Sequence, residues 1–431
     1  MNSSRGKPGR LLLSVIVACL VYIGIEGLCY LGLRALHAKG VDYEPLPSVL
    51  SQDQKNSLIA RLKDDPPLRG HHPALGWLRS RSTQDVTINS QGIRSVQEHS
   101  TDVDPKRIRV SAFGDSFTFG DEVADVDTWE YQLAELDARF EVLNFGMGAY
   151  GLDQAYLRYL QEGVRFHADI VIIGFMSENI YRNLTVFRPF YSGMYKESVY
   201  TKPRFSVGDG RLVLWANPLA TADDYARFVN DDEAVLREIG RHDYFYQTGY
   251  LAGPLDPLPS VRLSKITMRT VRERLNPVVT SEGSYAASSE ALNLTEKILE
   301  EFHCSALQQG SLPVIVIYPD LGDFERHRAG RPERYEPLMR HLKTKGFRYV
   351  DVLDAIVLDD PEVRVDRLTV GQWGHYSRLG NRIVARHLHR YLTEQRLVSR
   401  EAIKALARTV QEQQGCRPKV TFEPYARPGV P

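Results

Sequence analysis

A serine stands where an apolar, β-branched run gives way to a helix-forming segment. The run Ile108–Phe113 is followed at once by GDSFTFG, residues 114 to 120, which places Ser116 at the predicted turn between a strand and a helix. A serine hydroxyl attacks a carbonyl efficiently when a base removes its proton and N–H donors hold the oxyanion. A strand-to-helix turn supplies free N–H groups and the positive end of the helix dipole. The position suits a nucleophile, although Gly-Asp-Ser is also an ordinary turn and N-cap sequence.

Three later segments make this interpretation more specific because of their order along the chain. LNFGMGAYGLDQ follows the second apolar run, GFMSENIYRN follows the third, and GHYSRLGNRIVARHL precedes the last long helical pattern. Together with GDSFTFG they resemble the four sequence blocks of the SGNH (GDSL-like) hydrolase family. Members of that family share a flavodoxin-like fold and act on ester bonds.

The resemblance implies a catalytic role for each matched residue. Ser116 would be the nucleophile, His375 its general base, and the Ser116 N–H one oxyanion donor. The Asn179 side chain would be another donor, although its neighbours Glu178 and Ile180 depart from the usual Gly-x-Asn-Asp pattern.

The second block of the family also supplies an oxyanion-hole N–H, from a glycine. In LNFGMGAYGLDQ the position that matches this glycine is Ala149, whose backbone N–H is unaffected by the change of side chain. Gly148 and Gly151 are alternatives for the same role.

The acid of the triad is missing from its expected place. Family members commonly have an aspartate three residues before the histidine, and here that residue is Gln372. The alternatives are a Ser-His pair assisted by Gln372 or a backbone carbonyl, a carboxylate from elsewhere such as Asp366 or Asp320, or lost activity. The first two are favoured because the other catalytic groups are present. Asp115 is expected to hydrogen-bond the turn that presents the serine.

Short apolar runs that alternate with helix-length segments predict the elements that position these residues. The fold class is α/β, a flavodoxin-like three-layer α/β/α domain with a parallel five-stranded sheet. The predicted strands are Ile108–Phe113, Phe140–Phe145, Ile170–Phe175, Val314–Tyr318 and Tyr349–Val352. The predicted helices are Thr128–Leu136, Asp153–Glu162, Ser288–Gln309, Pro332–Lys345 and Leu379–Glu394.

An apolar segment at the N-terminus predicts a membrane anchor. Leu11–Leu33 is long enough, as a helix, to cross a hydrocarbon core of about 30 Å. It is longer than the core of a usual signal peptide and lacks a clean cleavage site, so we expect it to stay uncut. The charges beside it modestly favour a cytoplasmic N-terminus and an outer, extracytoplasmic domain. Glu26 is an anomaly within this segment, because a carboxylate in lipid is costly.

The rest of the chain is divided by composition. The predicted parts are a cytoplasmic tip and anchor (1–37), a stalk and N-terminal cap (38–106), the hydrolase-like domain (107–400) with an insertion at about 180–282, and a tail (401–431) expected to be disordered or loosely packed. The aromatic-rich insertion is either a substrate-covering lid or a segment that simply packs on the domain.

Charge and composition limit the functions that the chain can have. Lys+Arg and Asp+Glu both number 54, so no net field favours nucleic acid. Cysteine and histidine show no zinc spacing, and we expect no metal or cofactor. The leading hypothesis is a membrane-tethered serine esterase or O-acyltransferase whose substrate carries an ester. Resemblance to SGNH proteins that act on exported polysaccharides implies an acylated cell-surface glycan as the substrate class. The rival is a catalytically silent SGNH-like scaffold in an envelope or polysaccharide assembly, suggested by Gln372 and Glu26.

Overall fold

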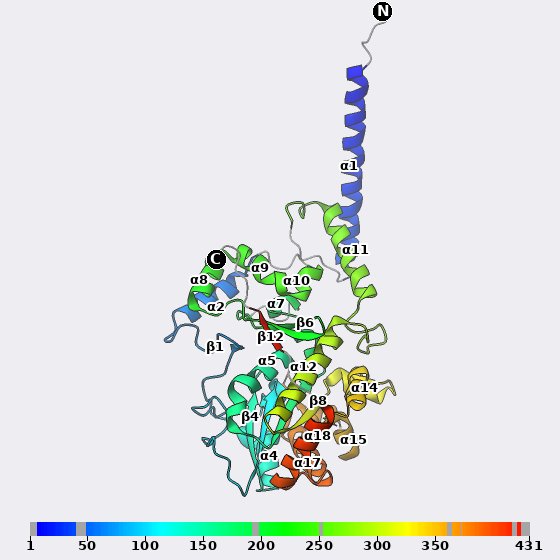
Figure 1. The fold of residues 1–431 in the computed structure, drawn as a ribbon. Coiled ribbons are helices and arrows are strands. Elements are labelled where there is room, and N and C mark those ends of the chain that lie inside the picture. The colour runs from blue at the N-terminus through cyan, green and yellow to red at the C-terminus, as the bar shows by residue number, and fades with distance from the viewer. Residues whose placement is uncertain are drawn as a thin grey trace, which may run out of the picture.

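Five apolar strands form the parallel sheet at the centre of the domain (Figure 1). The computed structural model describes residues 7–39, 49–191, 198–249, 253–359, 364–371, 373–415 and 420–423. The strands are β3 (Ile108–Gly114), β4 (Phe140–Gly146), β5 (Ile170–Met176), β8 (Leu312–Tyr318) and β9 (Tyr349–Asp351). Their order in the sheet is β4-β3-β5-β8-β9, all parallel, which is the flavodoxin-like order. The predicted fold class and the five predicted strands are confirmed.

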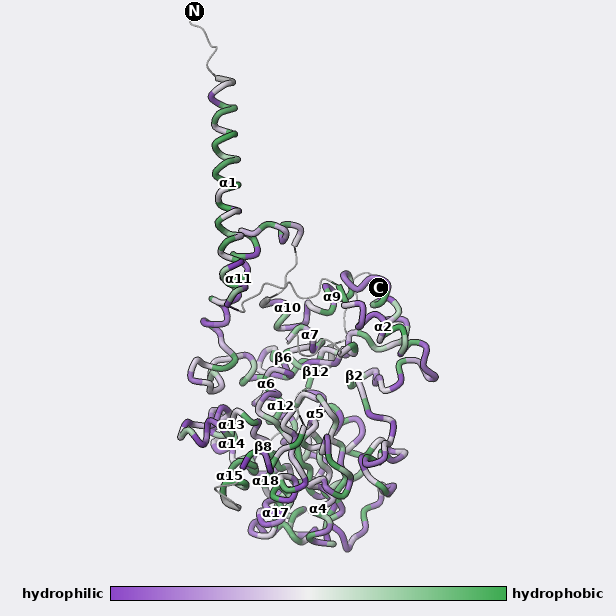
Figure 2. Tube along the Cα trace, turned by 180° about the vertical axis from the view of Figure 1, so that it is seen from behind, coloured by the Kyte–Doolittle hydropathy of each residue, from purple (hydrophilic) through white to green (hydrophobic). Residues whose placement is uncertain are grey.

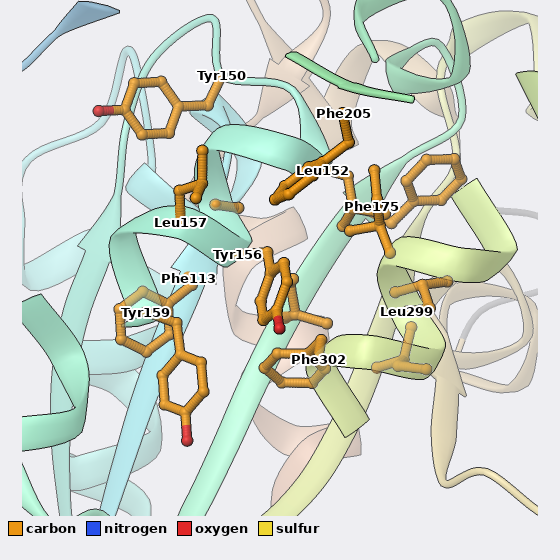
Figure 3. Packing of buried hydrophobic residues seen from close by; sticks show 14 of the residues in the cluster. Phe113, Tyr150, Leu152, Tyr156, Leu157, Tyr159, Phe175, Phe205, Leu299 and Phe302 are labelled. Carbon is orange, nitrogen blue, oxygen red and sulfur yellow. The ribbon is translucent and has the colours of Figure 1, made fainter. Parts of the chain in front are cut away.

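Helices cover both faces of this sheet, because the strands are apolar on both faces. Successive residues of β3 alternate between two cores: Phe113 packs with α5 (Leu152–Arg158), α12 (Glu290–Gln308) and α14 (Glu336–Lys345), and Val110 and Ala112 pack on the opposite side. Figure 3 shows the first core, where Phe113, Tyr156, Tyr159 and Phe302 meet. The second core lies under α4 (Trp129–Leu136), α15 (Val352–Asp359) and α17 (Arg378–Glu394). The result is the three-layer arrangement expected.

The long segment between β5 and β8 has structure of its own, as its length required. Its elements are α6 (Asn179–Arg182), α7 (Arg188–Tyr191), β6 (Arg204–Gly208), β7 (Arg211–Trp215), α8 (Ala222–Asn230), α9 (Asp232–Ile239), η5 (Gly240–His242), α10 (Tyr244–Gly249) and α11 (Pro259–Leu275). A third apolar core joins α8 and α9 to α2 (Gln52–Leu62) from the predicted N-terminal cap. A buried ion pair between Lys202 and Asp153 ties the insertion to α5.

The segment after residue 400 is not loose, and the expectation of a disordered tail is wrong for its first part. Ser399 caps α18 (Arg400–Gln414), and Ile403, Ala407 and Val410 are buried on one face of it. Their spacing of four and three residues is that of a core-facing helix. Further on, β12 (Val420–Glu423) pairs in parallel with β7 and is the third strand of the sheet of the insertion.

The N-terminal helix α1 (Lys7–His37) projects from the domain (Figure 1) and is apolar along most of its length (Figure 2). Gly9–His37 is long and apolar enough to cross a membrane, with a mean hydropathy of 2.4 in its most apolar window, and that window is not buried in the protein. Its C-terminal part packs against α11.

The remaining described elements are short and mostly shape the rim of the sheet. They are β1 (His71–His72), β2 (Gly76–Trp77), α3 (Ser116–Phe119), η1 (Asp125–Asp127), η2 (Tyr159–Gly163), η3 (Val164–Phe166), α13 (Leu321–Arg328), α16 (Val365–Leu368), β10 (Thr369–Val370) and β11 (His375–Tyr376).

Candidate active site

Ser116 is the first residue of the one-turn helix α3, directly beyond the carboxyl end of β3. Asp115 is the N-cap: its Oδ1 accepts a hydrogen bond of 2.8 Å from the Phe117 N–H. This bond is the role that the sequence predicted for Asp115. The Ser116 N–H belongs to the first turn of a helix, where N–H groups have no acceptor within the helix.

Three glycines at the ends of adjacent strands let α3 lie against the sheet. A Cβ on Gly114 or Gly174 would lie 2.1 or 2.2 Å from Thr118 Oγ1, and one on Gly146 would lie 2.3 Å from the Phe119 backbone nitrogen. None of these distances is compatible with a side chain. The glycines of the GDS, NFG and GFM motifs are therefore needed for the close approach of α3 to β3, β4 and β5.

Two buried polar side chains hold the far end of α3 and the loop that follows it. Asn144 donates from Nδ2 to the carbonyls of Thr118 and Phe119. Arg94, from the N-terminal cap, donates to the carbonyls of Phe119 and Gly120 at 2.8 and 2.6 Å and pairs with Asp125. The loop after the nucleophile is therefore held in place by Arg94, which lies about twenty residues upstream in the sequence.

Ala149 adopts a left-handed backbone conformation, with a φ of 69°. Such a φ disfavours residues with a Cβ and explains why a glycine is usual at the position that the resemblance assigns to Ala149. Ala149 and Gly148 both line the cavity beside Ser116. Gly151 does not serve as a donor here, because its N–H is engaged by Gln154 Oε1 at 3.1 Å.

Asn179 lies behind the nucleophile turn and is almost fully buried. Its Nδ2 donates a hydrogen bond of 2.7 Å to Asp115 Oδ2. The amide therefore orients the N-cap of α3, and only its second hydrogen is left for another acceptor. Asn179 is not among the residues that line the cavity.

His375 lies on the other side of the cavity, on β11. Its Nδ1 is 3.0 Å from Glu122 Oε2, and its ring centroid is 5.4 Å from that of Phe117. A neutral imidazole that donates from Nδ1 carries its lone pair on Nε2, which is the form required of a general base. No direct hydrogen bond joins Ser116 Oγ to the His375 ring, both of which are described; such bonds often tighten only when substrate binds.

The carboxylate against His375 is one that the sequence did not reveal. Asp366 is wrong as the supporting acid, because it is exposed and pairs with Arg364. Gln372 lies outside the described residues. Asp320 lines the cavity, but it caps α13 and pairs with Arg334.

Glu122 reaches His375 by an unusual backbone path. Its own φ is 69°, and a Cβ on Gly371 would lie only 2.0 Å from Glu122 Oε2. The position of the Glu122 carboxylate therefore depends on a left-handed backbone conformation in its own loop and on the absence of a side chain at Gly371 in another loop. No motif of fixed spacing connects Glu122 to the histidine. The only indication of its role in the sequence was its position just after GDSFTFG.

The two sides enclose a cavity of about 650 Å³. Its wall is formed by Ser116, Phe117, Asp121, Glu122, Gly148, Ala149, Met176, Glu178, Arg182, Arg188, Tyr191, Asp320, Trp373 and His375. Burial raises the pKa of Asp121, while the nearby His375 acts in the opposite direction. Arg182 and Arg188 are buried here, not solvated on the surface, and Arg182 pairs with Glu178 at 2.6 Å.

Solved structures similar to this chain carry related names. A lipolytic protein of the G-D-S-L family from Desulfitobacterium hafniense is 15% identical, with 66% of this chain and 99% of that chain covered and a TM-score of 0.29. The chain is similar to G-D-S-L lipolytic proteins. A catalytic mutant of an acetylxylan esterase from Geobacillus stearothermophilus is 12% identical, with 66% and 93% covered and a TM-score of 0.34.

No family model matches the sequence, and no match was found among curated proteins. Likeness to G-D-S-L proteins at this distance does not assign an activity.

Proposed function

We propose that the protein is a serine esterase or O-acyltransferase in which Ser116, His375 and Glu122 form the catalytic triad. The observation that carries the proposal is that Ser116 and His375 line one cavity. The Nδ1 of His375 is within hydrogen-bond distance of the Glu122 carboxylate. These residues lie far apart in the sequence, and a structural role for the histidine would not require it to share a cavity with a serine at a helix start.

In the proposed mechanism His375 Nε2 takes the Ser116 hydroxyl proton as Oγ attacks the ester carbonyl. Glu122 fixes the tautomer and stabilises the imidazolium that forms. The Ser116 and Ala149 N–H groups hold the oxyanion, and Asn179 positions the turn that carries the first of them through its hydrogen bond to Asp115. The proton then passes from the imidazolium to the departing alcohol, which leaves an acyl group on Ser116. Water or a sugar hydroxyl resolves this acyl-enzyme.

The finer parts of the proposal concern substrate and location. Phe117, Met176, Tyr191 and Trp373 give the cavity an apolar and aromatic wall, and carbohydrate rings commonly stack on such side chains. We propose an O-acetyl ester of an exported or cell-surface polysaccharide as the substrate. The helix α1 would anchor the chain in a membrane, with the catalytic domain on the outer side.

The features that suggested a silent scaffold both have structural explanations compatible with an enzyme. Glu122 supplies the carboxylate missing at Gln372, and Glu26 hydrogen-bonds Ser260 of the insertion. No specific observation favours the scaffold over the enzyme.

The experiment that tests the nucleophile is labelling with a fluorophosphonate probe. We expect wild-type protein to be labelled, Ser116→Ala to lose the label, and Ser281→Ala, which changes an exposed serine, to keep it. Absence of labelling in folded wild-type protein would overturn the proposal and favour the catalytically silent scaffold. Acetate release from a panel of acetylated glycans, with and without acceptor sugar, would then separate hydrolase from transferase.

A further inference from the structure

The carboxylate of Glu26 is placed where it caps a helix of the insertion. Glu26 accepts hydrogen bonds from the Ser260 N–H at 2.9 Å and from the Ser260 hydroxyl at 2.5 Å. Ser260 is in the first turn of α11, whose own N-cap residue, Leu258, offers no side-chain acceptor. A carboxylate at a helix N-terminus satisfies free N–H groups and interacts favourably with the helix dipole.

This contact fixes α11 along the C-terminal part of α1. Gly32 lies against Leu263 of α11, one to two turns beyond the Glu26 contact. Figures 1 and 2 show the start of α11 beside α1, beyond the rest of the domain. Glu26 is about 24 Å along the helix from Arg10, and the hydrocarbon core is about 30 Å thick. If α1 spans the bilayer, as proposed, the start of α11 lies at the level of the outer leaflet.

The exposed surface of this segment has the composition of a membrane-contacting helix. Met268, Val271 and Leu275 are apolar and exposed, and their spacing of three and four residues puts them in one stripe; Leu255 is exposed in the turn before the helix.

A basic stripe runs beside this apolar one. Arg262, Lys265, Arg269 and Arg272 follow each other at intervals of three or four residues. Residues 253–275 carry five basic and two acidic side chains, a net charge of +3, in a chain whose total charge is zero. Two of the basic groups are paired, Lys265 with Asp256 and Arg269 with Glu273. Basic side chains beside exposed apolar ones suit the headgroup region of an anionic membrane, which α11 crosses alongside α1.

We propose that residues 253–275 form a second membrane contact that docks the domain on an anionic phospholipid surface. The anchor alone would leave the domain free to tilt about the end of α1. The α11 segment, fixed to α1 by Glu26, sets the height and orientation of the domain, and so of the Ser116 cavity, above the lipid. The proposal goes beyond the esterase chemistry and rests on α1 being the membrane anchor.

Depth-dependent quenching by doxyl-labelled lipids tests this contact in the full chain. Single cysteines carrying a fluorophore are introduced by Leu255→Cys and Met268→Cys, in a background without the native cysteines, in nanodiscs of DOPC alone or DOPC with 30% DOPG. Ile16→Cys reports the insertion of α1. Val96→Cys, exposed and apolar but outside the segment, is the matched control that should remain in water.

We expect strong quenching at positions 16, 255 and 268, little at 96, and at least twofold more quenching at 268 with DOPG than without it. The triple change Arg262→Gln, Arg269→Gln and Arg272→Gln should remove the gain from DOPG. Quenching at 16 with none at 255 and 268 would overturn the second contact and leave the anchor intact. Absence of quenching at 16 would overturn both. Fluorophosphonate labelling of the same samples is independent of either result and reports the esterase proposal alone.

Discussion

The two sides of the cavity are held in place very differently. On the nucleophile side, Asp115, Asn144 and Arg94 make several buried hydrogen bonds to α3 and its loop, and three glycines seat the helix on the sheet. On the base side, the His375 ring has one side-chain hydrogen bond among the described residues, with Glu122. The position of the serine is thus fixed by several hydrogen bonds, whereas the imidazole is oriented by one carboxylate and by ring packing on Phe117.

This difference has a chemical rationale. The serine and the oxyanion donors must be placed accurately in advance, because electrostatic stabilisation of a transition state requires fixed dipoles. The histidine must instead change its charge and exchange protons during a turnover. A single charged partner stabilises the imidazolium without a dense network that would have to be rearranged.

Removal of the single contact on the base side should have the largest effect. Glu122→Gln keeps the shape of the side chain but loses the charge, and its amide can present a donor to Nδ1 and so favour the wrong tautomer. We expect kcat to fall about 10³- to 10⁴-fold, with little change in thermal stability, because the side chain is about one-third exposed. Kinetics on an activated acetyl ester and a melting curve measure the two quantities.

Asp366→Asn is the matched control, since that carboxylate was an alternative suggested by the sequence and it pairs with the exposed Arg364 instead of His375. Activity should stay within about twofold of wild type. A large loss in this variant and none in Glu122→Gln would reverse the assignment of the acid.

On the nucleophile side, the loss of one network member should cost stability as well as activity. Arg94→Met keeps much of the volume but removes the side-chain donor to the Gly120 and Val123 carbonyls and one of the two side-chain donors to the Phe119 carbonyl. We expect a loss of about 3 kcal/mol or more in the free energy of unfolding and a lower kcat through the loosened loop. Urea denaturation followed by Trp fluorescence provides the number. An unchanged unfolding midpoint would mean that this side is no more constrained than the other.

The sequence predicted the nucleophile side of the cavity better than the base side. The strands were found almost to the residue because, buried on both faces, they are continuous apolar runs, and Ser116 follows directly from the end of one. Glu122 could not be found, because its approach to His375 depends on a positive φ and on Gly371 from a distant loop. The helix α18 was missed although its apolar residues have helical spacing; the polar, Pro-rich stretch after it dominated the composition.

The base side also contains a carboxyl group that should make stability depend on pH. Asp351 ends β9, accepts hydrogen bonds from the Tyr335 hydroxyl, and has a pKa raised to about 7 by burial and by the charge of Asp354. A carboxyl with a raised pKa in the folded state stabilises the fold when it is protonated. That contribution is complete below the unfolded pKa of about 4 and is lost as the pH rises through 7.

The free energy of unfolding should therefore fall as the pH rises from 4 to 7, by at most about 1.4 kcal/mol for each pH unit from this group. In Asp351→Asn the slope should flatten, since the amide cannot ionise. Denaturant titrations of both proteins at pH 4.5, 6 and 7.5 provide the comparison. Parallel curves would show that Asp351 is not the group responsible.

The smallest effect is expected at Ala149, which has a left-handed backbone conformation. A left-handed conformation costs a residue with a Cβ about 1–2 kcal/mol, and the greater freedom of glycine in the unfolded chain offsets about 0.5–1 kcal/mol of that. Ala149→Gly should therefore stabilise the fold by about 0.5–1 kcal/mol. Its kcat should remain within about threefold, because the proposed oxyanion N–H is retained. Ala155→Gly, in the interior of α5, should have the opposite sign, since glycine is unfavourable in a helix by about 1 kcal/mol. Opposite shifts in melting temperature would show that the alanine at position 149 lowers the stability of the fold. A loss of stability in both variants would mean that the packing of the Ala149 methyl group outweighs its backbone strain.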